Sequence, residues 1–166
     1  MAQITLKGNT INTVGELPSK GEQAKNFTLV KNDLSRVSLD DFNAKKLVLN
    51  IFPSLDTGTC AASVRKFNEA AAGLDDTEVL CISRDLPFAQ ARFCGAEGIN
   101  NVVTLSDYET GKFGDDYDLT IADGPLKNLH SRVAIVLDEN RKVVYTQQVP
   151  EIVDEPDYDE ALNALK

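Results

Sequence analysis

The chain has 166 residues, of which 42% are hydrophobic and 26% are charged, and its formal net charge at pH 7 is −9. This length predicts one domain, residues 1–166, whose core is large enough to fold without disulfides or metals. The negative charge and the scattered Lys and Arg residues disfavour nucleic acid as a partner. The longest apolar run, Val133–Leu137, is far shorter than the roughly 18 residues that span a membrane. Because Met1–Lys7 does not resemble the start of a signal peptide, we expect a cytoplasmic protein.

The first part of the chain predicts short strands. Four are expected before residue 40, in two hairpins, and they are Ile4–Leu6, Thr10–Val14, Phe27–Val30 and Arg36–Leu39. Gly8-Asn9 is the expected turn of the first hairpin. The pattern then changes, because Leu47–Phe52 is an almost continuous apolar run, which is typical of a strand buried on both faces.

From Leu47 onward the pattern predicts alternating strands and helices. Apolar residues at spacings of three and four predict a helix from Cys60 to about Gly73. A second helix is expected from Pro87 to Gly95 or Gly98 with Asp85 as its cap, and the last helix from near Pro156. The remaining strands are expected at Val79–Ile82, Val102–Leu105, Val133–Leu137 and Val143–Val149. This order predicts an α/β protein with a thioredoxin-like fold, in which helices flank a mixed central sheet and an N-terminal β-hairpin is added.

The three cysteines are candidates for redox or packing roles. An odd number argues against a disulfide framework, and their spacing fits no common zinc pattern. Cys81 lies in an apolar strand, so we expect it in the core. Cys60 is expected at the start of a helix that follows a buried strand, where free N–H groups and the helix dipole stabilise a thiolate. Position alone leaves simple packing as the alternative for Cys60.

Two motifs resemble those of a known family. Pro53, Thr57 and Cys60 form the pattern P-x-x-x-T-x-x-C, which resembles the active-site loop of the peroxiredoxins. The segment Ser83–Cys94, with the sequence SRDLPFAQARFC, resembles the signature of the bacterial thiol peroxidase subfamily, the atypical two-cysteine peroxiredoxins. The similarity includes Ala122–Lys127 and extends over nearly the whole chain.

The resemblance implies a role for each matching residue. Cys60 matches the peroxidatic cysteine, which a peroxide oxidises to a sulfenic acid, and Cys94 matches the resolving cysteine, which closes an intrasubunit disulfide with it. Thr57 matches the threonine that hydrogen-bonds the peroxide and the thiolate. Pro53 matches the proline that shields the site from water, and Arg132 matches the arginine that faces the sulfur.

The resemblance also implies the activity and the partners. It implies an antioxidant enzyme that reduces hydrogen peroxide and organic hydroperoxides, including alkyl and lipid hydroperoxides, without metal, haem or flavin. Thioredoxin is the implied reductant and a homodimer the implied assembly. The chain departs from the subfamily at Thr59, where we expect Val, and this departure leaves the pocket shape and the preferred peroxide open.

A lowered thiol pKa does not by itself make a peroxidase. Lowering a thiol pKa from ~8.5 to ~6 raises the thiolate fraction at pH 7 from about 3% to about 90%. Nucleophilicity falls with the pKa, and a Brønsted slope of ~0.45 removes about ten-fold of this gain. The larger contribution is therefore expected from donors aimed at the oxygen where charge develops, for which Thr57 and Arg132 are the candidates.

Two alternatives to a peroxidase are weighed. A peroxide sensor would use the same cysteine chemistry and pass its disulfide to a partner protein. A cysteine hydrolase would need a histidine base near Cys60, and the only histidine is His130. Because His130 lies in a polar segment, we expect it to be exposed and without a role.

The positions of Cys60 and Cys94 predict a conformational change on oxidation. The two residues lie at the start of one helix and near the end of the next, whereas a disulfide needs Cα atoms within about 7 Å. We therefore expect the reduced chain to hold the sulfurs apart, with Phe88 and Phe93 helping to bury the second helix. Formation of the disulfide would then unwind part of that helix.

Overall fold

The computed structural model describes residues 1–166 and contains nine strands, four α-helices and one 3-10 turn, η1 (Leu39–Asp41). The strands are β1 (Gln3–Leu6), β2 (Asn9–Asn12), β3 (Thr28–Val30), β4 (Arg36–Ser38), β5 (Lys46–Ile51), β6 (Thr77–Ser83), β7 (Val103–Ser106), β8 (Val133–Leu137) and β9 (Val143–Gln148). The helices are α1 (Gly58–Ala71), α2 (Pro87–Glu97), α3 (Lys112–Asp116) and α4 (Tyr158–Asn163).

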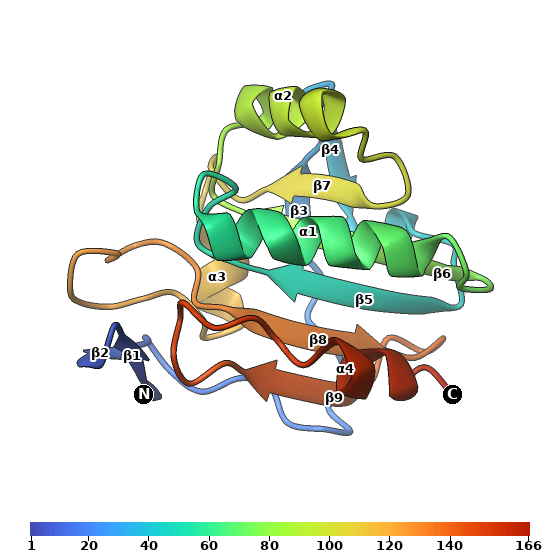
Figure 1. The fold of residues 1–166 in the computed structure, drawn as a ribbon. Coiled ribbons are helices and arrows are strands. Elements are labelled where there is room, and N and C mark those ends of the chain that lie inside the picture. The colour runs from blue at the N-terminus through green and yellow to red at the C-terminus, as the bar shows by residue number, and fades with distance from the viewer.

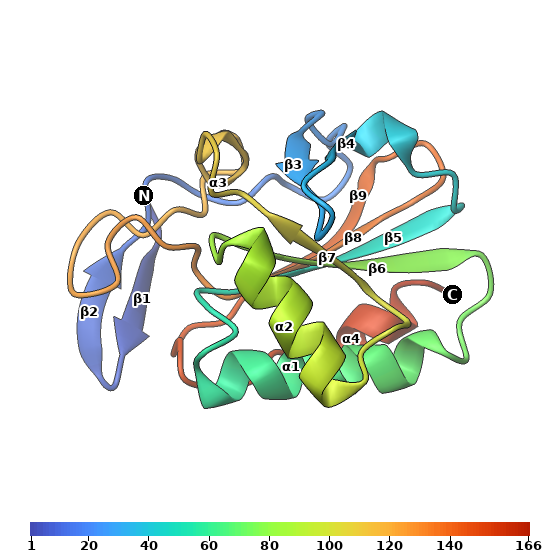
Figure 2. The same cartoon turned by 90° about the horizontal axis from the view of Figure 1, so that it is seen from above.

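Seven of the strands form a mixed central sheet in the order β4-β3-β7-β6-β5-β8-β9. β5, β6 and β7 are parallel to one another, whereas β8 pairs antiparallel with β5, and β9 with β8. Helices α1, α2 and α4 cover one face of the sheet and α3 lies on the other (Figures 1 and 2). The expectation of a mixed α/β sheet between helices is confirmed. None of the helices is long and apolar enough to cross a membrane.

The two faces of the sheet carry separate parts of the core. Side chains alternate across a strand, so Leu47 and Leu49 of β5 belong to one apolar cluster and Val48 to the other. The second cluster includes Val64 and Phe67 of α1. Each such side chain, when fully buried, stabilises the fold by about 1.5–3 kcal/mol. Every residue from Leu47 to Ile51 is buried, which confirms the expected doubly buried strand.

The N-terminal hairpin is confirmed, but its turn lies one residue earlier than expected. β1 and β2 pair with Leu6 opposite Asn9, so the turn is Lys7-Gly8 rather than Gly8-Asn9. Both turn residues have positive φ, 50° and 83°, as a type I′ turn requires. The hairpin stands beside the sheet rather than within it, next to the chain that precedes β8 (Figure 2). It packs through a small cluster of four isoleucines, which are Ile4, Ile11, Ile121 and Ile152.

Helix α2 is held to the sheet by few buried side chains. Only Pro87 and Gln90 of this helix are buried, and Gln90 donates hydrogen bonds to Ser83 Oγ at 3.2 Å and to the Leu105 carbonyl oxygen at 2.8 Å. Phe88 is 67% exposed, so the expectation that it helps to bury the helix is wrong. Phe93 packs against the second apolar cluster as expected.

The expectation that Asp85 caps α2 is also wrong. The cap residue is Leu86, which makes no side-chain cap bond, and Pro87 begins the helix without an N–H that needs a partner. The Asp85 carboxylate instead accepts hydrogen bonds from Ser54 Oγ at 2.7 Å and from the Leu55 N–H at 2.8 Å. Asp85 therefore joins the start of α2 to the loop between β5 and α1.

Candidate active site

Cys60 lies in the first turn of α1, at the end of the loop that leaves β5. Thr57 is the N-cap of this helix, and its hydroxyl accepts a hydrogen bond from the Cys60 N–H at 3.4 Å and donates to the Ser54 carbonyl oxygen at 3.0 Å. Pro53 is buried in the same loop, and Cys60 is 0% exposed. The thiol thus lies below the surface, beside the positive end of a helix dipole.

Arg132 places a charged group beside the Cys60 sulfur. Its Nη2 is 3.2 Å from Cys60 Sγ, and its Nε donates to the Ile152 carbonyl oxygen at 2.8 Å. The residue is 2% exposed, so its guanidinium lies inside the protein rather than in solvent. Its Nη1 has no hydrogen-bond partner in the protein. The structure gives this buried guanidinium no carboxylate partner, and Nη1 is a free donor beside the sulfur.

The other two cysteines lie in different surroundings. Cys94 of α2 is partly buried, with Sγ 3.7 Å from Thr104 Oγ1 of β7. Cys81 of β6 is 0% exposed, which confirms the expected core position, and burial raises the pKa of its thiol to about 12. At neutral pH Cys81 is therefore a protonated, unreactive thiol.

Cys60 and Cys94 contact groups that belong to distant strands. All three cysteines are free thiols. Cys94 contacts β7, whereas Cys60 contacts Arg132, which immediately precedes β8. β7 and β8 are separated by β6 and β5, so their axes are about 14 Å apart at the usual strand spacing. A disulfide, in contrast, needs Cα atoms within about 7 Å.

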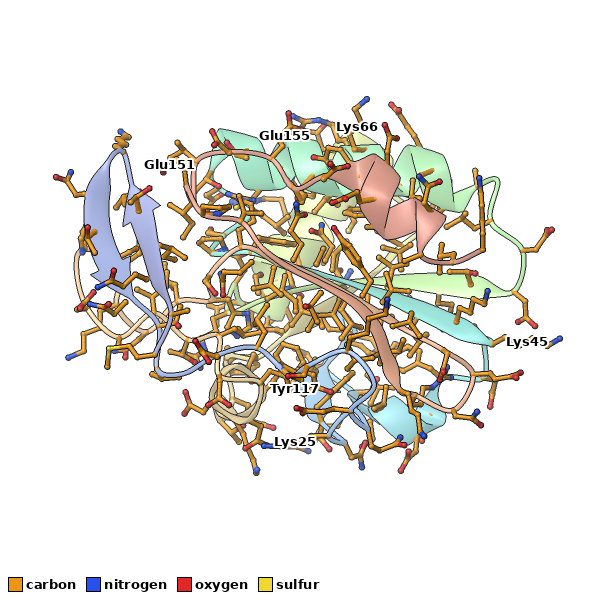
Figure 3. The ribbon with its side chains drawn as sticks, turned by 90° about the horizontal axis from the view of Figure 1, so that it is seen from below. Lys25, Lys45, Lys66, Tyr117, Glu151 and Glu155 are labelled. Atoms are coloured by element: carbon orange, nitrogen blue, oxygen red, sulfur yellow. The ribbon has the colours of Figure 1, made fainter.

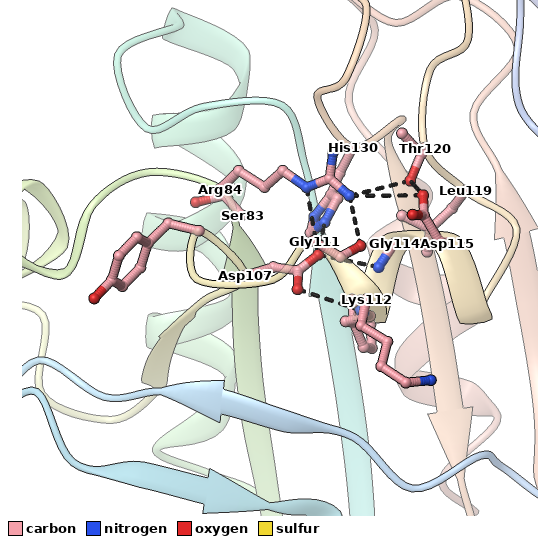
Figure 4. Close-up of polar contacts among 12 residues, drawn as sticks. Ser83, Arg84, Asp107, Gly111, Lys112, Gly114, Asp115, Leu119, Thr120 and His130 are labelled. Carbon is pink, nitrogen blue, oxygen red and sulfur yellow. Dashed lines mark hydrogen bonds and ion pairs between the residues drawn. The ribbon is translucent and has the colours of Figure 1, made fainter.

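His130 is buried, so the expectation that it is exposed is wrong. It is 0% exposed, and its Nε2 is 2.8 Å from Asp107 Oδ2. Arg84 Nε lies 3.4 Å from the same carboxylate, which also accepts from the backbone N–H groups of Phe113 and Gly114 (Figure 4). The polar sequence around His130 did not indicate this burial, because its partner Asp107 follows β7 and the ring of Phe113 from α3 lies beside it. Since the Nε2 atom contacts Asp107, the structure gives no support to His130 as a base for Cys60.

The surroundings of His130 favour its neutral form. Burial lowers the pKa of His130, and the hydrogen bond to Asp107 only partly opposes this effect. Burial would raise the pKa of Asp107, but the hydrogen bonds from His130 and Gly114 and the positive charge of Arg84 outweigh it and hold that pKa below its ordinary value.

Two contacts that support the site had no signal in the sequence. The Ile152 carbonyl oxygen holds Arg132 from 20 residues away. Thr59, where the resemblance led us to expect Val, donates a hydrogen bond from its hydroxyl to the Val153 carbonyl oxygen at 2.8 Å, 94 residues away in sequence. A backbone acceptor can be any residue type, so neither partner could be identified from residue identity.

A thioredoxin-like sheet with a buried helix-start cysteine that contacts an arginine is typical of thiol-based redox proteins. The Redoxin family model matches residues 19–162. Over 165 residues, and 99% of both chains, the sequence is 57% identical to a thiol peroxidase of Corynebacterium glutamicum and 56% identical to a thiol peroxidase of Mycobacterium tuberculosis. The chain therefore belongs to the thiol peroxidase family of the peroxiredoxins, and it is a peroxidase.

Solved structures share this fold. A peroxiredoxin-like protein from Aquifex aeolicus superimposes with a TM-score of 0.92 at 37% identity, covering 98% of this chain and 95% of that one. A thiol peroxidase from Chromobacterium violaceum superimposes with a TM-score of 0.87 at 21% identity, covering 98% and 94%. The expected thioredoxin-like fold with its N-terminal hairpin is confirmed.

The buried neutral His130 predicts a pH dependence of stability. Below about pH 6.5 the unfolded chain binds a proton at His130 and the folded chain does not, so the free energy of unfolding falls as the pH decreases. The slope should approach about 1.4 kcal/mol per pH unit and vanish above pH ~7. Denaturant unfolding of the wild-type chain and of His130→Gln between pH ~5.5 and ~7.5 tests this. The variant should show a clearly flatter slope, and equal slopes would contradict the prediction.

Proposed function

We propose that the chain reduces hydrogen peroxide and organic hydroperoxides, with Cys60 as the peroxidatic cysteine, in the cytoplasm. The observation that carries the proposal is the 3.2 Å contact between Arg132 Nη2 and the sulfur of Cys60. We further propose that residues 1–166 act as one domain and that two copies form a homodimer.

In the first step, the Cys60 thiolate attacks the terminal oxygen of the peroxide. The S–O bond forms as the O–O bond breaks, which leaves Cys60 as a sulfenic acid and releases an alkoxide that takes a proton to become an alcohol or water. Arg132 has a free Nη1 beside the sulfur, where a donor can stabilise the charge on the departing oxygen. Thr57 has its hydroxyl at the helix start and supplies a second donor when it turns from Ser54 toward the peroxide. Pro53 keeps water away from the thiolate.

In the second step, the Cys94 thiol attacks the sulfenic sulfur. A Cys60–Cys94 disulfide forms and one water molecule leaves. The first turn of α1 must leave Arg132 and α2 must leave Thr104, because the sulfurs lie beside different strands. α2 has few buried side chains to hold it, and such elements open locally at low cost.

In the third step, an external dithiol returns two electrons and restores both thiols. We propose thioredoxin as this reductant. The cycle uses no metal, haem or flavin, since each electron pair passes between sulfur and oxygen or between sulfurs.

Steady turnover distinguishes this enzyme from a peroxide sensor. With thioredoxin, thioredoxin reductase and NADPH, the wild-type chain should consume NADPH continuously after peroxide is added. Cys60→Ser should abolish consumption, because the only other free thiols lack the contact with Arg132. Cys81→Ser should stay within a few-fold of wild type, since that thiol is buried and protonated.

Two outcomes would contradict the proposal. A single stoichiometric burst in the wild-type chain would favour the sensor that passes its disulfide to a partner protein. An inactive Cys81→Ser together with an active Cys60→Ser would show that the wrong cysteine has been assigned.

Arg132→Lys should separate charge from geometry. Lysine keeps the positive charge but lacks the planar fork that reaches both the sulfur and an adjacent oxygen. Stopped-flow measurement of Cys60 oxidation should show a loss of about 10²-fold or more, whereas the thiolate fraction, followed by ultraviolet absorbance, should fall far less. Arg36→Lys, at an exposed ion pair with Glu109, is the matched control and should react like wild type. A rate loss equal to the loss of thiolate would contradict the role of oriented donors.

A further inference from the structure

The segment Glu151–Val153, which follows β9, binds both Arg132 and the first turn of α1. The Ile152 carbonyl oxygen accepts from Arg132 Nε at 2.8 Å, and the Val153 carbonyl oxygen accepts from Thr59 Oγ1 at 2.8 Å. Figure 3 shows Glu151 on the side of the molecule where the N-terminal hairpin lies. One short stretch of backbone therefore fixes the arginine and, independently, the helical turn that carries Cys60.

The N-terminal hairpin forms hydrogen bonds with the same segment. The Glu151 carboxylate accepts from the Gly8 N–H at 2.8 Å, the Lys7 N–H at 3.1 Å and Thr5 Oγ1 at 3.1 Å. The Ile152 N–H donates to the Thr5 carbonyl oxygen at 2.9 Å, and the Ile152 side chain is buried. The Val153 carbonyl oxygen that binds Thr59 thus belongs to a segment that several hydrogen bonds hold in place.

The hydroxyl of Thr59 opposes the movement that disulfide formation needs. The first turn of α1 is otherwise capped only by the long 3.4 Å bond between Thr57 Oγ1 and the Cys60 N–H. If Cys60 is to leave Arg132 and reach Cys94, this turn must unwind, and the bond from Thr59 to Val153 must break.

We propose that Thr59 is a positioning residue that holds the first turn of α1 in its peroxide-reactive form and thereby slows disulfide formation. The inference rests on the proposed roles of Cys60 and Cys94. A slower second step leaves the Cys60 sulfenic acid exposed to a second peroxide, which oxidises it to a sulfinic acid and is itself reduced to an alcohol or water. Valine, expected at this position from the subfamily, has the same shape as threonine but lacks the hydroxyl.

Thr59→Val tests the proposal, and Thr59→Ser, which keeps the hydroxyl, is its matched control. After one equivalent of peroxide, acid quenching and mass spectrometry follow the disulfide; at higher peroxide they follow the sulfinic acid. In Thr59→Val the disulfide should form about two- to five-fold faster, and the sulfinic fraction should fall by a similar factor. This is the effect expected from the loss of one exposed hydrogen bond. Thr59→Ser should match wild type. Disulfide formation in Thr59→Val that is equal to or slower than in wild type would overturn the proposal.

Amide hydrogen exchange of the reduced proteins tests the same bond without peroxide. Exchange at residues 58–61 should be about two- to five-fold faster in Thr59→Val than in wild type, and unchanged in Thr59→Ser. Equal exchange in all three proteins would overturn the proposal that the bond from Thr59 to Val153 holds this turn. A wild-type chain that forms no Cys60–Cys94 disulfide would instead overturn the proposed function, and the exchange rates would still decide whether Thr59 holds the turn.

Discussion

The contact between Arg132 and Cys60 depends on the pairing of two central strands. β5 and β8 are antiparallel neighbours, and their register places Ile51 opposite Val133. The chain leaves β5 after Ile51 toward α1 and enters β8 directly after Arg132. Cys60 and Arg132 therefore both lie near the same end of this strand pair. Both strands are buried, and a slip of one residue would turn every side chain to the wrong face, so this register is strongly specified. The sheet thereby fixes an arginine against a thiol that is 72 residues away in sequence.

The two cysteines differ in how firmly their surroundings are held. Cys60 is fully buried and is supported by Arg132 and by the backbone after β9, which the N-terminal hairpin anchors. Cys94 lies on α2, a helix with two buried residues, Pro87 and Gln90. In the proposed cycle a peroxide meets an ordered set of donors, whereas the Cys94 thiol travels to the sulfur of Cys60. A rigid site for the proposed first step and a weakly held helix for the second would satisfy both needs within one fold.

The strands that depend on local apolar patterns could be predicted from the sequence. Strand β8 has the expected bounds, and β5 differs by one residue at each end, because continuous apolar runs identify buried strands. Cys60 could be proposed from its position at a helix start, with packing as the alternative, whereas the other candidate site residues could be proposed only from motifs that resemble those of a family. Errors arose where distant contacts override local pattern: His130 lies in a polar stretch but is buried against Asp107, and Phe88 is apolar but 67% exposed. The bond from Thr59 to Val153 had no signal, because the acceptor is a backbone oxygen.

We expect that one arrangement of the chain cannot serve both proposed steps, because the reduced fold holds the two sulfurs beside different strands. Amide hydrogen exchange of the reduced and disulfide forms tests this most directly. On oxidation, protection from Asp85 to Ala96 should fall by an order of magnitude or more, while protection of β8 should barely change. Equal protection of Asp85–Ala96 in the two forms would contradict the account, since it would mean that the sulfurs join without any opening of α2.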